Sequence, residues 1–355
     1  MRMRKWTIGS ALAAGLLMLS AVSLTALAET ADNPESRIIV IGGGVPTAWA
    51  GPGAQAENTG AGSVSQTTAA GPGAQTTAAG PGEQAAAQTF SVQASSAGQT
   101  FSARPRKSME ELQAVMAEVP AGPAKAEWGT FFLGNNLPPQ NDEDEAYLRA
   151  FHAYAMVPGE EKSVYLTFDE GYENGYTPVI LDILAKHNVK AAFFCTGSFV
   201  RESPELVRRF AQEGHIIGNH TLTHPSMMSV DNWAEFSRQL LSVEDLVKDV
   251  TGTDMPRYYR PPAGAYSEAQ LRMADAMGFR TVFWSVAYKD WDTSAQPTHE
   301  RAMNYLTTRI HPGAIVLLHA VSKTNAEILD ELLTRWEQMG YTFKTLDELP
   351  EGLTE

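Results

Sequence analysis

Seven short apolar runs, separated by segments with helical periodicity, recur between residues 163 and 345. Each run has the length of a buried strand, and regular alternation of strands with helices is typical of parallel βα units. The strands are expected at 163–168, 191–195, 215–219, 258–260, 281–285, 314–318 and 341–345. The pattern predicts an α/β fold, with the strands arranged as an incomplete (β/α) barrel.

Helices are expected between these strands. Ser108 with Glu111, and Ser267 with Gln270, have the spacing of a capping box at a helix N-terminus. The helices are expected at 108–118, 177–187, 203–214, 231–250, 267–278 and 325–339, with a weaker one before the strand at 314–318.

The N-terminal 28 residues have the organisation of a secretory signal peptide. Basic residues at positions 2, 4 and 5 precede an apolar run from residue 8 to 24, and Ala26-Leu27-Ala28 fits a small-x-small cleavage site. If this segment is not cleaved, it is expected to act as a membrane anchor. Both alternatives predict an extracytoplasmic protein that is secreted or associated with the cell envelope.

Residues 29–125 are expected to form a disordered tether. Between residues 42 and 98 the composition is dominated by Ala, Gly, Gln, Thr and Pro, and the nonapeptide at 67–75 is followed by a near copy at 76–84. Such a sequence has almost no apolar side chains to bury. The folded domain is therefore expected at residues 126–352.

Composition excludes some classes of protein. The single cysteine, Cys195, lies in an apolar run and is expected to be a buried strand residue, so no intramolecular disulfide can form. The net charge is −14, and no basic run follows the N-terminus, which argues against nucleic acid as a partner. A membrane contact is expected only through an uncleaved N-terminal segment, and we expect a monomer.

Short polar runs lie at or just beyond the ends of five of the expected strands. A barrel places its chemistry at the C-terminal ends of successive strands. The set contains imidazoles and carboxylates, which metal-assisted hydrolysis requires. The runs are Asp169-Glu170, His220-Thr-Leu-Thr-His224, Arg260-Pro-Pro-Ala-Gly264, Asp290-Trp291 and Leu317-Leu318-His319.

Taken singly, each run has a structural and a functional interpretation. The histidines at 220 and 224 could bind a metal or face solvent, and Pro225 favours a turn over a helix there. Adjacent carboxylates at 169 and 170 could begin a solvated loop, or serve as metal ligand and general base. Arg260 could form a structural ion pair or grip a carboxylate of the site. His319 could be a core residue, or a general acid held by Asp290. Trp291 could be a core residue or an aromatic surface on which a sugar stacks.

Together and in this order, the runs carry a family resemblance. The segment 128–349 resembles the polysaccharide deacetylases, the NodB homology domain of carbohydrate esterase family four, and its first match is Thr167-Phe-Asp-Glu170. The longer strings at 166–176, 214–220 and 282–287 are similar to the delta-lactam-biosynthetic branch, which removes acetyl groups from N-acetylmuramic acid in spore cortex peptidoglycan. The resemblance implies a distorted (β/α)7 barrel, a role in sporulation, and glycan strands of peptidoglycan as partner.

The resemblance also implies a role for each site residue. Asp169 would be the general base, oriented by Arg260, and His319 would be the general acid, held by Asp290. His220 and His224 would bind a divalent metal with Glu170 as third ligand. The expected metal is zinc, with cobalt, nickel or manganese as alternatives. Substrate contacts are expected from Tyr172, Pro262, Gly264, Trp291 and Leu317.

Two positions differ from the family pattern and leave alternatives open. Glu170 stands where the wider family has Asp and the lactam branch usually has Asn, and Ala263 stands where that branch usually has a basic residue. One alternative is the same chemistry on N-acetylglucosamine in peptidoglycan or on another polysaccharide. A second is a non-catalytic module that binds cell-wall glycan, although the complete set of chemical groups argues against it.

Overall fold

The computed structural model describes one compact unit of the chain, within residues 1–44 and 102–355. The segments expected to be the signal peptide and most of the tether lie outside the described residues. The described residues are 37–38, 108–118, 126–141, 143–159, 161–230 and 232–351.

The centre of this unit is a parallel sheet, and the predicted strands are confirmed. They are β6 (Ser163–Glu170), β7 (Ala192–Cys195), β8 (Ile216–Asn219), β9 (Tyr258–Tyr259), β11 (Arg280–Val282), β12 (Ala314–His319) and β13 (Thr342–Lys344). A further parallel strand, β5 (Ala153–Tyr154), was not predicted. The order is β12-β6-β7-β8-β9-β11-β5, and β13 pairs with the first residues of β6.

The two ends of this sheet meet, which makes the sheet a distorted barrel. The backbone N–H of Leu317 donates to the carbonyl of Val286 at 2.9 Å, and that of Val157 donates to the carbonyl of Gly313 at 2.9 Å. These contacts are isolated bridges beyond β11 and β5 and not a continuous ladder. The barrel is therefore closed at single residues on one side, as expected for the (β/α)7 fold.

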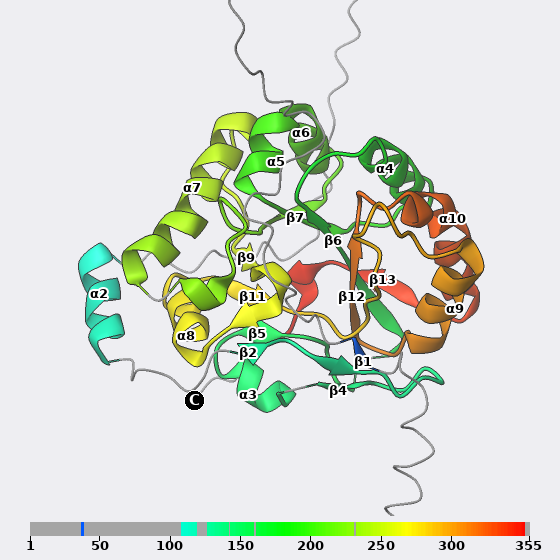
Figure 1. Cartoon of the computed structure of the whole chain (residues 1–355), viewed down its shortest axis with the longest axis horizontal. Coiled ribbons are helices and arrows are strands. Elements are labelled where there is room, and N and C mark those ends of the chain that lie inside the picture. Colours follow the sequence, from blue (N-terminus) through cyan, green and yellow to red (C-terminus); the bar gives the residue numbers. More distant parts are fainter. Residues whose placement is uncertain are drawn as a thin grey trace, which may run out of the picture. The chain divides into compact units, whose positions relative to one another are not determined.

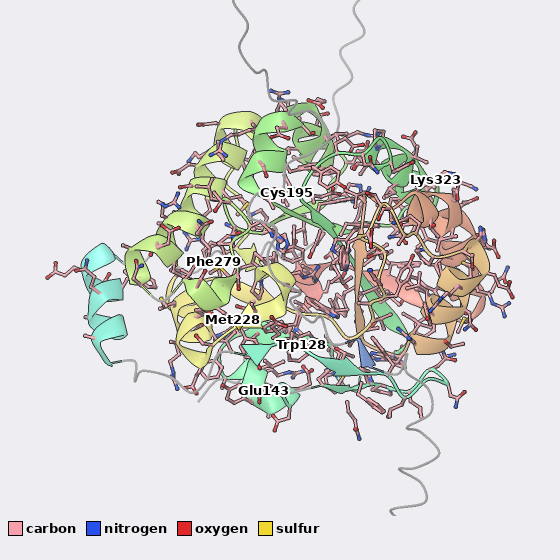
Figure 2. All side chains as sticks on the ribbon, in the orientation of Figure 1. Trp128, Glu143, Cys195, Met228, Phe279 and Lys323 are labelled. Carbon is pink, nitrogen blue, oxygen red and sulfur yellow. The ribbon has the colours of Figure 1, made fainter. Side chains whose placement is uncertain are left out.

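Helices surround the strands on the outside (Figure 1). They are α4 (Thr177–Lys186), α5 (Gly197–Glu202), α6 (Pro204–Gln212), α7 (Trp233–Thr251), α8 (Glu268–Ala276), α9 (His299–Arg309) and α10 (Lys323–Gln338). Alternate strand residues, such as Phe168 and Phe193, pack against these helices, while Tyr165 and Phe194 face the barrel interior. Cys195 is buried as predicted, and Figure 2 shows it among the packed side chains.

Smaller elements precede the barrel. They are β1 (Arg37–Ile38), α2 (Met109–Glu118), β2 (Ala126–Glu127), β3 (Thr130–Phe131), β4 (Gln140–Asn141) and α3 (Glu145–Arg149). Helix α2 lies inside the region expected to be tether, yet its Leu112 is buried in the main core. The predicted capping box is present at its start. The Glu111 side chain accepts from the N–H of Ser108 at 2.6 Å, and the N–H of Glu111 donates to the Ser108 hydroxyl at 3.2 Å.

The second predicted capping box is only half formed. The Ser267 hydroxyl accepts from the backbone N–H of Gln270, but the Gln270 amide does not return to Ser267. It donates instead to the carbonyls of Met227 and Val230. Gln270 is buried, so its amide satisfies tertiary partners in preference to its own helix end. No helix among the described residues is long and apolar enough to span a membrane.

Candidate active site

The functional side chains gather where the parallel strands end. Asp169 and His319 are direct partners in the register of β6 and β12, so their side chains leave the same face of neighbouring strands. His220 follows β8 directly and its N–H continues the ladder to Cys195 at 3.0 Å. Arg260 follows β9, and its N–H donates to Asn219 at 2.9 Å. The sheet thus brings together residues that lie up to 150 positions apart in the sequence.

Asp169 is a buried carboxylate held by a fully buried guanidinium. Nη1 of Arg260 donates to Oδ1 of Asp169 at 2.7 Å, and Nη2 donates to the Thr167 hydroxyl at 2.9 Å. Burial by itself would raise the pKa of the Asp169 carboxyl, but the charges of Arg260, His220 and His319 lower it below its usual value. Asp169 is therefore ionised near neutral pH and can accept a proton.

Arg260 has no freedom to leave this carboxylate. Its Nε donates to the carbonyl of Val282 at 3.0 Å, Nη2 donates also to that of Phe283 at 3.2 Å, and the guanidinium lies 4.2 Å from the centre of the Phe194 ring. Gly218, opposite Phe194 on β8, makes room for that ring, because a Cβ there would lie 2.5 Å from it. The planar fork of arginine can make all these contacts together, which lysine cannot.

The loop after Arg260 is fixed from outside the barrel. Ala263 (φ 53°) and Gly264 (φ 66°) both have left-handed backbone. The N–H of Trp128 donates to the carbonyl of Gly264 at 2.9 Å, and its indole donates to the carbonyl of Trp284 at 2.8 Å. A Cβ at Gly264 would lie 2.7 Å from the Trp128 Cβ. Trp128 therefore braces the loop that aims Arg260.

His220 and His224 face one another across a turn. Their ring centres are 4.9 Å apart with a 70° angle between the planes. The turn is stabilised by Thr221, whose hydroxyl accepts from the N–H of His224 at 3.1 Å. The prediction that Pro225 excludes a helix here is confirmed, but His224 has left-handed backbone (φ 52°) where extended backbone was expected.

The hydrogen bonding of His220 sets its tautomer. Nδ1 lies 2.9 Å from the carbonyl of Arg260, so it carries the proton and donates it. Burial lowers the pKa of His220 below its usual value despite the nearby Asp169, and burial, followed by the neighbouring His220 ring, lowers the pKa of His224 to about 3. Both rings are therefore neutral. Nε2 of His220 then presents a lone pair to Oδ2 of Asp169, 3.5 Å away.

This arrangement fits a cation beside the two imidazoles. Two electron-rich atoms, Nε2 of His220 and Oδ2 of Asp169, face each other and would be stabilised by a positive ion between them. Histidines that bind metals usually donate their other N–H to a carbonyl or carboxylate, as His220 does. Within the described ranges, however, no three His, Cys, Asp or Glu side chains are arranged to enclose a metal ion.

Glu170, the expected third ligand, is the last residue of β6. Its side chain is fully buried, neither carboxylate oxygen has a hydrogen-bond partner among the described residues, and it forms no ion pair with His220 or His224 there. Burial, followed by the charges of Glu173 and Asp169, raises the pKa of Glu170 well above its usual value. Ligation by Glu170 remains a prediction.

On the opposite side of Asp169 lies a second pair, formed by His319 and Asp290. Oδ1 of Asp290 accepts from Nδ1 of His319 at 2.8 Å, and Oδ2 accepts from the backbone N–H of His319 at 2.8 Å. Burial alone would lower the pKa of His319, but the carboxylate of Asp290 raises it above its usual value. His319 is 17% exposed at the side chain, so it can hold a proton and deliver it through Nε2.

The residues expected to contact substrate differ in accessibility. Pro262, Gly264 and Leu317 are buried, and Leu317 packs in the same cluster as Trp128. Tyr172 is partly exposed. Trp291 is 46% exposed, and the ammonium of Lys289 lies over its ring, 5.0 Å from the ring centre. Substrate contact by this set stays a prediction, and Trp291 is its most accessible member.

The sequence analysis missed the residues that hold the site residues in place. Thr167, Phe194 and Trp128 support Arg260, and Asn325 with Tyr288 supports Asp290. Thr167 lies two positions before Asp169 on β6, so strand periodicity could have placed it on the same face. Asn325 lies 35 residues from Asp290, and no local pattern marks it.

Comparisons with known proteins identify relatives of this chain. A sequence model of the polysaccharide deacetylase family matches residues 157–282. The chain is 43% identical over 223 residues to the peptidoglycan-N-acetylmuramic acid deacetylase PdaA of Bacillus subtilis, covering 62% of this chain and 84% of that protein. It is 36% identical over 203 residues to a peptidoglycan-N-acetylglucosamine deacetylase of Bacillus cereus, covering 56% of this chain and 72% of that protein.

A solved structure matches the fold as well. The structure of Bacillus subtilis PdaA, described as a family 4 carbohydrate esterase, covers 65% of this chain and 98% of its own, with a TM-score of 0.62 and 42% identity. This match extends well beyond the 126 residues between positions 157 and 282 that the family model covers. The chain belongs to the polysaccharide deacetylase family, carbohydrate esterase family 4.

Proposed function

We propose that this protein removes N-acetyl groups from amino sugars of peptidoglycan outside the cytoplasm, and that its substrate is N-acetylmuramic acid. The observation that carries the proposal is the placement of Asp169 and His319 as register partners on neighbouring strands, each with its own buried charged partner. Arg260 lowers the pKa of the carboxylate, and Asp290 raises the pKa of the imidazole. Deacetylation needs such a pair, since it begins with loss of a proton from water and ends with protonation of an amine.

In the first half of the reaction Asp169 acts as general base. Its Oδ1 is fixed by Arg260, so Oδ2, on the side of His220, is the oxygen that accepts the proton from the attacking water. The permanent charge of Arg260 favours the ionised carboxylate before the reaction. Because Arg260 is fully buried and bonded at every nitrogen, the carboxylate keeps one orientation.

In the second half His319 acts as general acid. Nδ1 of His319 stays on Asp290, and Nε2 carries the proton that the departing amine of the sugar requires. The amine is a poor leaving group unless it is protonated as the carbon–nitrogen bond breaks. Asp290 therefore contributes by stabilising the charged imidazolium before transfer.

His220 and His224, with Asp169 beside them, would hold a divalent metal, and zinc is the ion we propose. Imidazole ligands suit zinc and nickel, with cobalt as a further alternative, and a carboxylate ligand would suit manganese. When bound, the metal supplies polarisation of the acetyl carbonyl and acidification of the water. Glu170, whose buried carboxylate has no hydrogen-bond partner among the described residues, would complete the ligand set.

The choice of N-acetylmuramic acid rests on similarity. The relative that acts on N-acetylmuramic acid is matched at 43% identity over 84% of its length, and the one that acts on N-acetylglucosamine at 36% over 72%. Removal of the acetyl group from muramic acid without its peptide frees an amine, which can close a six-membered lactam with the lactyl carboxylate. We place this step in the cell envelope, with spore cortex peptidoglycan as the source of substrate.

The proposal is tested by Asp169→Asn and His319→Ala, assayed by mass spectrometry for acetate release from glycan strands that lack peptides. Loss of a general base typically costs about a hundred- to ten-thousand-fold in rate, and both variants are expected to lose that much while folding normally. Wild-type rates in Asp169→Asn would overturn the assignment of the base. Equal wild-type rates on chitin oligomers would move the substrate to N-acetylglucosamine, and glycan binding without any acetate release would favour a binding module.

A further inference from the structure

A buried asparagine contacts the carboxylate that holds the general acid. Asn325 lies in the first turn of α10 and is 1% exposed. Its Nδ2 donates to Oδ2 of Asp290 at 2.6 Å and to the backbone carbonyl of His319 at 3.1 Å. Both protons of the amide are therefore used, and both partners belong to the His319–Asp290 pair.

A tyrosine fixes which way the amide of Asn325 points. The hydroxyl of Tyr288 donates to Oδ1 of Asn325. Burial, followed by the charge of Asp290, raises the pKa of Tyr288, so the hydroxyl keeps its proton. With two acceptors on one side of the amide and a donor on the other, only one orientation satisfies all three contacts.

Asp290 depends on this amide because it has few other partners. It is fully buried, and its ion pair with His319 is the only one it forms among the residues that the structure describes. The neighbouring Lys289 pairs instead with Asp292, at 3.0 Å. The charge of Asp290 is therefore stabilised by three N–H contacts, of which the Asn325 contact is the shortest. A buried carboxylate that loses such a donor is strongly destabilised.

We propose that Asn325 and Tyr288 are positioning residues for the general acid. The chain of contacts runs from Tyr288 through Asn325 to Asp290 and then to Nδ1 of His319. It keeps the Nδ1–H of His319 on Asp290, in the neutral and in the protonated ring, and directs Nε2 to the reacting sugar. This inference rests on the proposed function, and it adds that residues of α10 and of the segment before Asp290 orient the general acid.

The test compares Asn325→Ala with Asn304→Ala, a matched change at an exposed position of α9. The amide substrate is glycan without peptides, and the second substrate is 4-nitrophenyl acetate, whose phenolate leaves without a proton. A hydrogen bond to a charged group corresponds to roughly a 10- to 100-fold rate effect. Asn325→Ala is expected to lower kcat on glycan by about that factor, with KM nearly unchanged and a much smaller loss on the ester. Asn304→Ala is expected to leave both rates unchanged.

A milder variant keeps the proposal testable if Asn325→Ala does not fold. Tyr288→Phe preserves the apolar packing and removes only the group that orients the amide, so about a 3- to 10-fold loss is expected, again confined to the amide substrate. Equal losses on both substrates, or unchanged kcat on glycan in both variants, would overturn the proposal.

A second measurement separates this inference from the proposed function. Nitrogen-15 NMR of the resting protein, recorded above the pKa of His319 where the ring is neutral, reports the tautomer of His319 without any turnover. The signal of a proton held on Nδ1 is expected in the wild type and is expected to weaken in Tyr288→Phe and Asn325→Ala. An unchanged tautomer in both variants would refute the positioning role even if the enzyme is active. Absence of acetate release by the wild type would refute the function and leave the tautomer result to decide the network.

Discussion

The chain has two comparable buried arginines, one inside the active site and one outside it. Comparing them separates the effect of a buried ion pair on stability from its effect on catalysis. Arg260 binds Asp169 within the site, and Arg257 binds Glu244 at 2.9 Å behind it, with a further bond to the carbonyl of Met277. Both guanidinium groups are buried and both use their forked geometry. They should therefore respond alike in stability and differently in catalysis.

We expect Arg260→Lys and Arg257→Lys each to lower the free energy of unfolding by about 1–3 kcal/mol, because a lysine leaves buried acceptors unsatisfied. Only Arg260→Lys is expected to lower kcat, by at least about tenfold, because it alone frees the orientation of Asp169. Denaturant unfolding and acetate release measure the two effects. A similar fall of kcat in Arg257→Lys would assign the loss to general destabilisation.

His311 gives the fold a dependence on pH at a position away from the site. Its ring is fully buried, with Nε2 at 2.9 Å from the Ser285 hydroxyl and Nδ1 at 2.9 Å from the carbonyl of Pro312. Burial lowers the pKa of His311 from 6.5 to about 4. Between these two values the unfolded chain binds a proton that the folded protein does not, so stability is lost as pH falls through this window.

The expected loss from His311 between pH 7 and pH 4 is at most about 3 kcal/mol, since one pKa unit corresponds to about 1.4 kcal/mol. Urea unfolding of the wild type and of His311→Gln at several pH values measures it. The stability advantage of the wild type should shrink as the pH falls. A difference between the two proteins that stays constant from pH 7 to pH 4 would contradict the assignment.

At the scale of elements, strands inside apolar runs were predictable, down to the two residues of β9, whereas β5 was not. Strand β6 has eight buried residues, which the sequence shows as a continuous apolar run followed by two carboxylates. Strand β5 has two residues, and it exists because β11 offers it a partner, which no local pattern records. Helix α5 was also not predicted. It has only six residues and begins at Gly197, and the need for glycine there comes from a tertiary contact, because a Cβ would clash with Leu222.

The same limit applies to the site. The chemical groups at strand ends were predictable, because parallel strands must end at one edge. Their supports were not, because contacts such as Gln270 to Val230 and Asn325 to Asp290 depend on how helices α8 and α10 pack.

The loop that follows β9 is predicted to be sensitive to a single methyl group. Gly264 and Gly252 both have left-handed backbone, but a Cβ at Gly264 would lie 2.7 Å from Trp128 and 2.9 Å from Trp284, whereas Gly252 has open space. Alanine at either position costs about 1 kcal/mol for the backbone alone. Gly264→Ala should cost more and should lower kcat, since Trp128 must move and the loop carries Arg260. Equal stability and activity in the two variants would show that the loop is not braced.

At the scale of the whole molecule, the boundary between tether and catalytic domain can be refined. The sequence analysis placed the boundary near residue 125, so that a protein starting at Lys125 should fold and turn over soluble glycan. Strand β2 begins at Ala126 and pairs with β10 (Ala265–Tyr266), which supports keeping everything from that point. Helix α2, before it, belongs to the same compact unit and contributes Leu112 to the core.

We therefore predict that a protein starting at Lys125 folds cooperatively but is less stable than one starting at Ser102 by about 2 kcal/mol. The reason is that removal of α2 exposes the core surface that Leu112 covers, and burial of one leucine side chain is worth about 1.5–3 kcal/mol. Leu112→Ala in the full chain should reproduce most of this loss, and Gln113→Ala, at an exposed position of the same helix, should not. Thermal and urea unfolding measure the differences. Equal stability of the two truncated proteins would show that α2 does not contribute to the folded domain. If the shorter protein does not unfold cooperatively, α2 is required for folding.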